Sequence, residues 1–106
     1  LEIKKLIQEN RPDVEIAEAM SNYHENDIAE LLENLSQPER KRIYHVLGLA
    51  KTANVFPYFD DPQQYIEEIS VEDAAAIISL MDSDDAVDIL EQLDPETKTR
   101  IVEKLR

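Results

Sequence analysis

Several features that define other classes of protein are missing or scarce in this sequence. It has no cysteine, which excludes a disulfide framework and a thiolate metal site. It has a single glycine, Gly48, and few β-branched or aromatic runs, which argues against a sheet-rich fold. Its longest nearly apolar stretch, residues 74–81, is interrupted by Ser79 and is far too short for a membrane span. No signal peptide is recognisable at its N-terminus.

Positive charge is also scarce. The chain has 11 Lys and Arg against 24 Asp and Glu, which gives a formal net charge of −13. A nucleic-acid binder needs a basic surface that replaces counter-ions, and an anionic membrane surface repels a chain of this sign. The sequence therefore predicts no nucleic-acid partner and no direct membrane insertion. Cations and basic protein surfaces are the partners that its charge favours.

The residues that are abundant favour helix. Glu, Leu, Ile, Ala, Lys and Gln dominate, and the length of 106 residues predicts a single domain over 1–106. Because the chain starts without Met and ends within a charged helical pattern, we expect it to be a fragment of a longer protein.

An apolar motif recurs along the chain at an interval of twelve residues. Each motif is an apolar pair followed three residues later by a third apolar residue. One of the intervals between motifs is shortened by two residues. The pairs are Ala19-Met20, Leu31-Leu32, Ile43-Tyr44, Val55-Phe56, Tyr65-Ile66, Ile77-Ile78, Ile89-Leu90 and Ile101-Val102. The opening residues Leu1, Ile3, Leu6 and Ile7 predict one further amphipathic helix.

Helix start signals precede several of these pairs by seven residues. Ser36, Ser70, Asp82 and Asp94 hold that position, where a side-chain oxygen can cap exposed helix N–H groups. Each twelve-residue repeat thus predicts a helix of about eight to ten residues followed by a tight turn. A helix of that length is only marginally stable in water unless neighbouring helices pack against it. We expect an all-α fold in which the short helices stack as a right-handed superhelix, a solenoid with a repeat of roughly twelve residues. Helix is least clearly predicted for residues 48–61, where Pro57 and Pro62 indicate a turn.

Nothing in the sequence predicts catalysis. His24 and His45 lack the spacing of a metal pair, and neither a glycine-rich phosphate loop nor a nucleophile motif is present. Both histidines are expected to be structural or solvent-facing. The chain is therefore predicted not to be an enzyme.

The most informative polar residues are four aspartates within seven positions, Asp82, Asp84, Asp85 and Asp88. On a helix, Asp84 and Asp88 share a face, and such a cluster suits a hard cation that takes oxygen ligands. The plainer interpretation is that Asp82 is an N-cap and that the other acids favour the helix dipole. Other acids are interpreted as turn or solvated surface: Glu30, Glu33, Asp60, Asp61, Glu67, Glu68 and Glu91.

Two segments, residues 24–35 and residues 71–95, resemble the cytosolic N-terminal domain of the MgtE family of magnesium transporters. Residues 47–62 are similar to that domain's repeat ending in Leu-Asp-Pro, although they are more aromatic here. The family's Asp-x-Asp-Asp-Ala-x-Asp stretch maps onto Asp82, Asp84, Asp85 and Asp88. The chain departs from the family at Ser83, where proline is common, and at Glu25, which follows His24 in place of proline.

The resemblance implies a function. In that family the domain is a right-handed superhelix followed by CBS domains and a membrane pore, and Mg²⁺ bound between the N-domain and the CBS domains keeps the pore shut. It implies Mg²⁺ as the ion sensed, with Mn²⁺ or Ca²⁺ as possible substitutes, and Asp84, Asp85 and Asp88 as the metal ligands. The expected partners are Mg²⁺ and the CBS domains of the same chain, in a homodimeric parent at the cytoplasmic face of the cell membrane.

The alternative hypothesis is an acidic helical scaffold for protein–protein interaction, like the related modules of flagellar motor proteins. Acidity would then serve only solubility and the choice of partner, with no metal role. The sequence that follows Arg106 separates the two hypotheses, since CBS-like segments and apolar spans favour the transporter.

Overall fold

The computed structural model describes residues 2–105, and these fold into α-helices joined by short turns. No strand occurs among them, as the composition predicted. Nine α-helices and one turn of 3₁₀-helix follow one another: α1 (Glu2–Gln8), α2 (Asp13–Met20), α3 (Glu25–Glu33), α4 (Gln37–Leu47), α5 (Leu49–Val55), η1 (Phe56–Tyr58), α6 (Pro62–Ile66), α7 (Val71–Ser79), α8 (Ser83–Gln92) and α9 (Pro95–Leu105).

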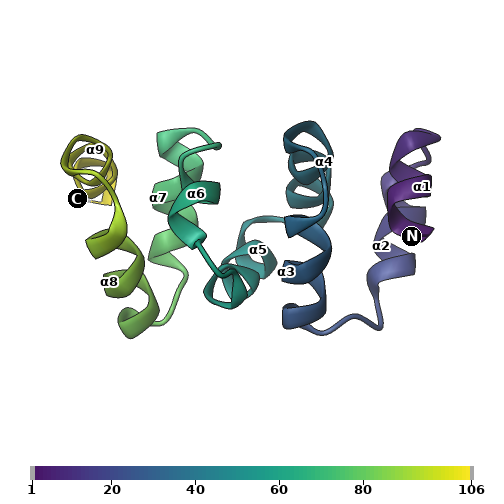
Figure 1. Ribbon diagram of the computed structural model, residues 1–106, viewed down its shortest axis with the longest axis horizontal. Helices are drawn as coiled ribbons and strands as arrows, with labels where there is room; N and C mark the ends of the chain where they lie inside the picture. Colours follow the sequence, from purple (N-terminus) through teal and green to yellow (C-terminus); the bar gives the residue numbers. More distant parts are fainter. Residues whose placement is uncertain (1, 106) are drawn as a thin grey trace.

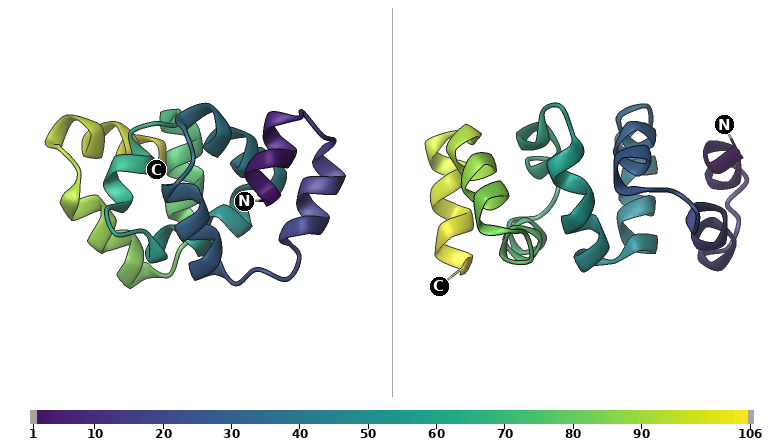
Figure 2. Two further views of the ribbon diagram at one scale, coloured as in Figure 1. Left: turned by 45° about the vertical axis from the view of Figure 1, so that its right-hand side comes forward. Right: turned by 90° about the horizontal axis from the view of Figure 1, so that it is seen from below.

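The helices line up along one long axis. The molecule measures 38 × 21 × 21 Å, with α1 and α2 at one end and α8 and α9 at the other (Figures 1 and 2). Packing is mostly between near neighbours in the chain, for example α1 with α2, α4 with α5, and α7 with both α5 and α9. A helix of 5–11 residues cannot cover its own apolar stripe, so each depends on the helices beside it.

The apolar pairs face the interior. Every one of the eight pairs has at least one buried member, and both members are buried at Leu31-Leu32, Val55-Phe56, Tyr65-Ile66 and Ile77-Ile78. The last apolar motif is less completely buried, because its third residue, Leu105, is 39% exposed. Since α9 is the last helix described, no later described helix covers that face.

Helix starts follow the twelve-residue interval except in the middle of the chain. Helices α2, α3, α4 and α5 begin at residues 13, 25, 37 and 49, and α7, α8 and α9 begin at 71, 83 and 95. Between them α6 begins at residue 62 and is only five residues long. The segment least clearly predicted as helix does form α5, which continues directly into η1 at Phe56.

A chain of four aromatic side chains in contact fills this irregular middle. The Phe56 ring lies 6.0 Å from the Tyr44 ring and 5.0 Å from the Phe59 ring, and the latter contact is edge-to-face. Phe59 in turn lies 4.3 Å from Tyr65. Phe56 is fully buried and Phe59 is 4% exposed, so the sequence 57–61 turns over an aromatic core where a regular helix is absent.

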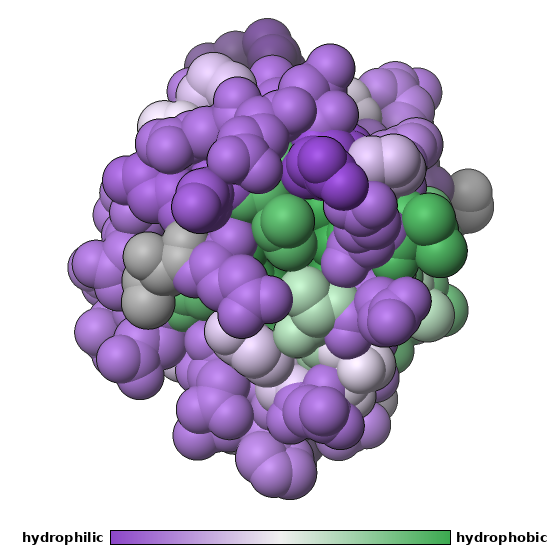
Figure 3. Space-filling model, turned by 90° about the vertical axis from the view of Figure 1, so that its right-hand side faces the viewer, coloured by the Kyte–Doolittle hydropathy of each residue, from purple (hydrophilic) through white to green (hydrophobic). Residues whose placement is uncertain are grey.

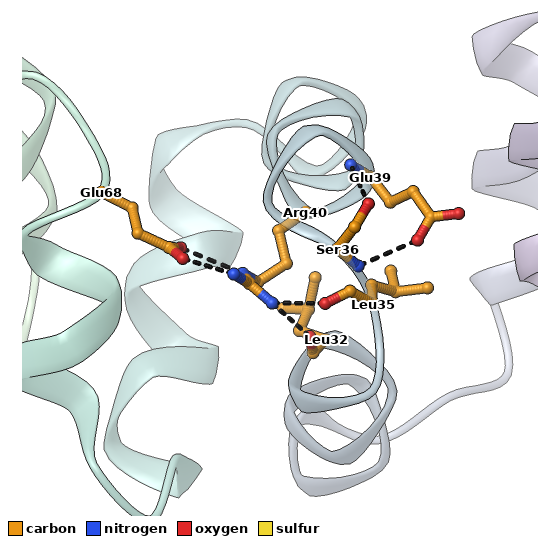
Figure 4. A network of polar contacts seen from close by, with 6 residues as sticks. All are labelled: Leu32, Leu35, Ser36, Glu39, Arg40 and Glu68. Carbon is orange, nitrogen blue, oxygen red and sulfur yellow. Dashed lines mark hydrogen bonds and ion pairs between the residues drawn. The ribbon is translucent and has the colours of Figure 1, made fainter.

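A buried cation joins three of the helices. The Arg40 guanidinium pairs with the Glu68 carboxylate just after α6 and donates to the carbonyl oxygens of Leu32 and Leu35 at the end of α3 (Figure 4). It also lies 5.0 Å from the centre of the Tyr65 ring. The interpretation of Glu68 as solvated surface is therefore wrong, because its side chain is only 17% exposed and neutralises Arg40. The pairing spans 28 residues, which local patterns do not reveal.

The end formed by α1 and α2 is mostly hydrophilic around a small apolar patch (Figure 3). Val14 is 70% exposed, and Leu6 and Ile7 are half-buried, whereas Ile3 and Ile16 lie in the core. Leu1, the first residue of the predicted amphipathic stripe, lies outside the described residues.

Candidate metal-binding surface

Helix α8 carries the predicted metal ligands on its outer side. Ile89 is buried, Ala86 and Leu90 are half-buried against the core, and the helix packs on α6. With its apolar positions turned inward, α8 leaves Asp84 and Asp88 exposed one turn apart, while Asp85 is half-buried. Asp84 and Asp88 thus lie as expected for i,i+4 neighbours on a solvated helix face.

Asp82 holds the N-cap position of α8, but its side chain accepts no capping hydrogen bond. The equivalent residues of other helices do cap. The Ser36 hydroxyl accepts from Glu39 N–H while the Glu39 carboxylate accepts from Ser36 N–H, and the Ser70 hydroxyl accepts from Asp73 N–H. The expectation that Asp82 is a capping side chain is therefore wrong in this respect, and its carboxylate remains available for other ligands.

The Asp94 carboxylate caps α9. It accepts from the Thr97 N–H at 3.1 Å and from the Thr97 hydroxyl at 2.7 Å. These hydrogen bonds hold the pKa of Asp94 below its usual value. Because the pKa is lowered in the folded state, this contribution to stability is present at neutral pH and is lost as the pH falls through the lowered pKa.

The capping difference gives a first prediction. Ser70→Ala should lower the free energy of unfolding by about 1 kcal/mol, because the Asp73 N–H loses its partner. Asp82→Ala should stay within about 0.5 kcal/mol of the wild type, since no capping bond is lost. Urea unfolding of the two variants measures both values. Equal costs would show that Asp82 caps α8 in solution.

None of the four aspartates is neutralised within the described part of the chain. Its ion pairs join Arg11 to Glu15, Arg40 to Glu68, Arg42 and His45 to Asp13, Arg100 to Glu96 and Lys104 to Glu72. Over residues 2–105, no three His, Asp or Glu side chains come close enough together to hold a metal ion by themselves. An ion at α8 must therefore take further ligands from water or from another surface.

Acidic and basic residues are distributed unevenly along the chain. The sequence motifs, considered one at a time, did not show this. Residues 52–97 contain 13 Asp and Glu and no Lys, Arg or His, while the other 60 residues contain 11 acids and 11 Lys and Arg. The whole net charge of −13 thus belongs to this stretch, hereafter the acidic half. Counting charge by segment would have revealed it from the sequence.

A polar cavity lies beside the start of α8. It has a volume of about 510 Å³ and is lined by Asp82 and Asp85, by Glu25 at the start of α3, and by Asn54, Tyr58 and neighbouring residues of α5 and η1. Glu25 is therefore a further acidic residue near the candidate ligands, and the sequence did not connect it with them because 57 positions separate it from Asp82. Asp84 and Asp88 do not line this cavity.

Neither histidine lines the cavity beside α8, although His24 directly precedes Glu25, which does. Both are exposed, and the His24 backbone N–H donates to the Asp27 carboxylate at 3.3 Å at the start of α3. His45 Nε2 lies 3.4 Å from the Asp13 carboxylate, which also accepts from Arg42. The structure gives both histidines surface contacts at helix ends.

Fold and surface together define an all-helical domain with one acidic half that its own cations leave largely unneutralised. The profile of the family described as the MgtE intracellular N domain matches residues 23–106, and the chain therefore belongs to this family. Among the helices described over residues 2–105, none is long and apolar enough to cross a bilayer.

A solved structure shows the same fold. The crystal structure of the soluble part of a magnesium transporter superposes with a TM-score of 0.89 over 98% of this chain, at 21% sequence identity. The chain spans 42% of the length of that structure. Comparison with curated proteins gives no match.

Proposed function

We propose that this chain is a cytosolic regulatory domain of a magnesium transporter that senses Mg²⁺, and that it catalyses no reaction. The observation that carries the proposal is the row of unneutralised carboxylates on α8 in a chain of the MgtE N-domain family. In this proposal Asp84, Asp85 and Asp88 contribute ligands, and the remaining ligands come from CBS domains that follow in the same chain. The parent protein is proposed to be a homodimer at the cytoplasmic face of the membrane.

The chemistry of the donor set fits such an ion. Mg²⁺ takes oxygen ligands and keeps several of its waters, so it binds through one or two carboxylates from each surface and needs no complete protein cage. This accords with the absence of a three-residue cluster within residues 2–105. Exposed Asp84 and Asp88 and half-buried Asp85 are accessible to a second domain.

Electrostatic repulsion supplies the switch in this proposal. Two carboxylates about 6 Å apart in water repel each other by roughly 0.7 kcal/mol. One pair decides little, but several facing pairs across an interface total a few kcal/mol, which is enough to shift a population between a closed and an open arrangement. Bound Mg²⁺ removes the repulsion and holds the surfaces together. When Mg²⁺ falls, the surfaces separate.

We propose that the superhelix is right-handed and that its repeat positions the switch. Consecutive helices such as α7 and α8 run in opposite directions (Figure 1), whereas the starts of α3 and α8 border one cavity, which Glu25, Asp82 and Asp85 line. The first turns of α3, α7 and α8 all carry acids: Glu25, Asp27, Glu72, Asp73, Asp84 and Asp85.

Limited proteolysis tests the proposal in a protein in which this chain is followed by CBS domains. Millimolar Mg²⁺ should make that protein more compact and slow its cleavage, because the ion joins α8 to the next domain. Asp84→Ala combined with Asp88→Ala should abolish the protection. The matched control is Asp60→Ala with Asp61→Ala, which removes the same charge from the acidic half at a distance from α8 in the sequence.

An outcome in which both double variants lose protection equally would favour the second candidate function, an acidic scaffold that binds a basic protein surface without a metal. The charge segregation supports that candidate, since a surface of one sign attracts any cationic partner. Protection that is unchanged by Asp84→Ala and Asp88→Ala contradicts the assignment of these ligands.

A further inference from the structure

A second cavity lies where the regular spacing of helices is broken. Helices α4 and α7 stand apart in the middle of the molecule, and α5 packs against both of them (Figure 1). Short α6 and the turn around Pro57 and Pro62 occupy the interval in which a regular helix would stand. The cavity between α4, α5 and α7 has a volume of about 500 Å³, within the range of small-molecule sites, and we call it the α4–α7 cavity.

The α4–α7 cavity has an apolar floor and walls of opposite charge. Leu49, Ile69 and Ile77 contribute the apolar surface. The α4 wall carries Lys41 and His45, which lie one turn apart. The α7 wall carries Asp73 and, at the N-cap of the helix, Ser70. No ion pair joins Lys41 to Asp73 or to any other described residue, so both charges are available to a ligand.

Buried hydroxyl groups without partners belong to the same cavity. Thr52 lines it and is 1% exposed, yet its hydroxyl makes no hydrogen bond. Tyr44 also lines it, and its buried phenol has no partner either. Burial raises the pKa of Tyr44, so the phenol stays protonated and remains a donor. A buried polar group without a partner destabilises a fold, and these two hydroxyl groups can hydrogen-bond to a molecule that enters the cavity.

We propose that the α4–α7 cavity binds a small zwitterion with an apolar side chain, of the class of free apolar α-amino acids. Lys41 receives the carboxylate, Asp73 receives the ammonium group, and the side chain lies on Leu49, Ile69 and Ile77, while His45 borders the site with its Nε2 already 3.4 Å from the Asp13 carboxylate. The two opposed walls disfavour a pure anion, which Asp73 repels, and a pure cation, which Lys41 repels. The Thr52 hydroxyl gains a polar partner from the ligand or from a water that the ligand holds.

Titration of L-leucine into the isotope-labelled chain, followed by amide chemical shifts, tests the proposal. Shifts should centre on residues 41–52 and 69–77 and saturate with a Kd on the order of millimolar. Leucinamide lacks the carboxylate and N-acetyl-leucine lacks the ammonium group, and each should bind at least about fivefold more weakly, because each loses one ion pair.

Variants at exposed wall positions separate recognition from folding. Lys41→Met and Asp73→Asn should each weaken L-leucine binding about fivefold, with unfolding unchanged. The controls Lys51→Met and Asp60→Asn change the same charges at exposed positions outside the cavity lining and should leave Kd unchanged. Absence of shifts at about 10 mM leucine, equal binding of leucinamide and N-acetyl-leucine, or equal effects of control and wall variants would each overturn the proposal. Asp84→Ala should not alter leucine binding, so this test is independent of Mg²⁺ sensing.

Discussion

Replacing Arg40 with alanine should cost about 3–5 kcal/mol of folding stability, because the change leaves a partly buried carboxylate without its cation. Arg40 is 8% exposed as a residue, and its guanidinium serves Glu68 and the carbonyls of Leu32 and Leu35 at once (Figure 4). The carbonyls at the end of α3 also lose their donor. Urea unfolding followed by circular dichroism measures the loss.

The matched control lies two positions along the same helix. Arg42 pairs with Asp13, whose side chain is 46% exposed, and Arg42→Ala should cost no more than about 1 kcal/mol. If the two variants lose equal stability, Arg40 is not the buried connection between α3, α4 and the end of α6. Arg40→Met with Glu68→Met should be less harmful than Arg40→Ala, since it leaves no charge unpaired.

Phe56→Ala should be the other large effect, with a loss of about 3–5 kcal/mol. The ring is fully buried between Tyr44 and Phe59, in the segment where the helix repeat is interrupted. Removing the ring leaves a cavity in the core and deletes both aromatic contacts. Thermal and urea unfolding measure the loss.

Tyr58 supplies the matched aromatic control within the same 3₁₀ turn. Its side chain is 57% exposed, and Tyr58→Ala should change stability by no more than about 0.5 kcal/mol. A cost for Tyr58→Ala equal to that for Phe56→Ala would mean that the turn depends on local aromatic contacts and not on the buried ring.

The sequence predicted what depends on local chemistry. Apolar pairs and caps at Ser36, Ser70 and Asp94 each act within one turn, so their spacing predicted the helices. The resemblance of residues 24–35 and 71–95 indicated the family, which is confirmed. The interval around Pro57 and Pro62 was correctly seen as irregular, although α5 forms ahead of it.

Features that depend on distant residues were not predictable in this way. Glu68 appeared solvated because its partner Arg40 lies 28 positions away, and Glu25 joins Asp82 only when α3 and α8 are placed in space. The shared face of Asp84 and Asp88 follows from helix geometry, whereas their role as metal ligands, with Asp85, stays a prediction because it requires a second domain. The unpaired Thr52 hydroxyl gave no signal in the sequence.

The uneven distribution of charge makes the cation concentration around the acidic half depend on salt. With no basic residue between Lys51 and Lys98, the acidic half gathers a counter-ion atmosphere in which every cation is enriched over the bulk solution. Monovalent ions thin this layer, whose depth is about 8 Å at physiological ionic strength. Under the proposed function, Mg²⁺ competes with monovalent cations in this layer before it meets a ligand on α8, and the Mg²⁺ concentration that half-saturates the domain should rise with ionic strength.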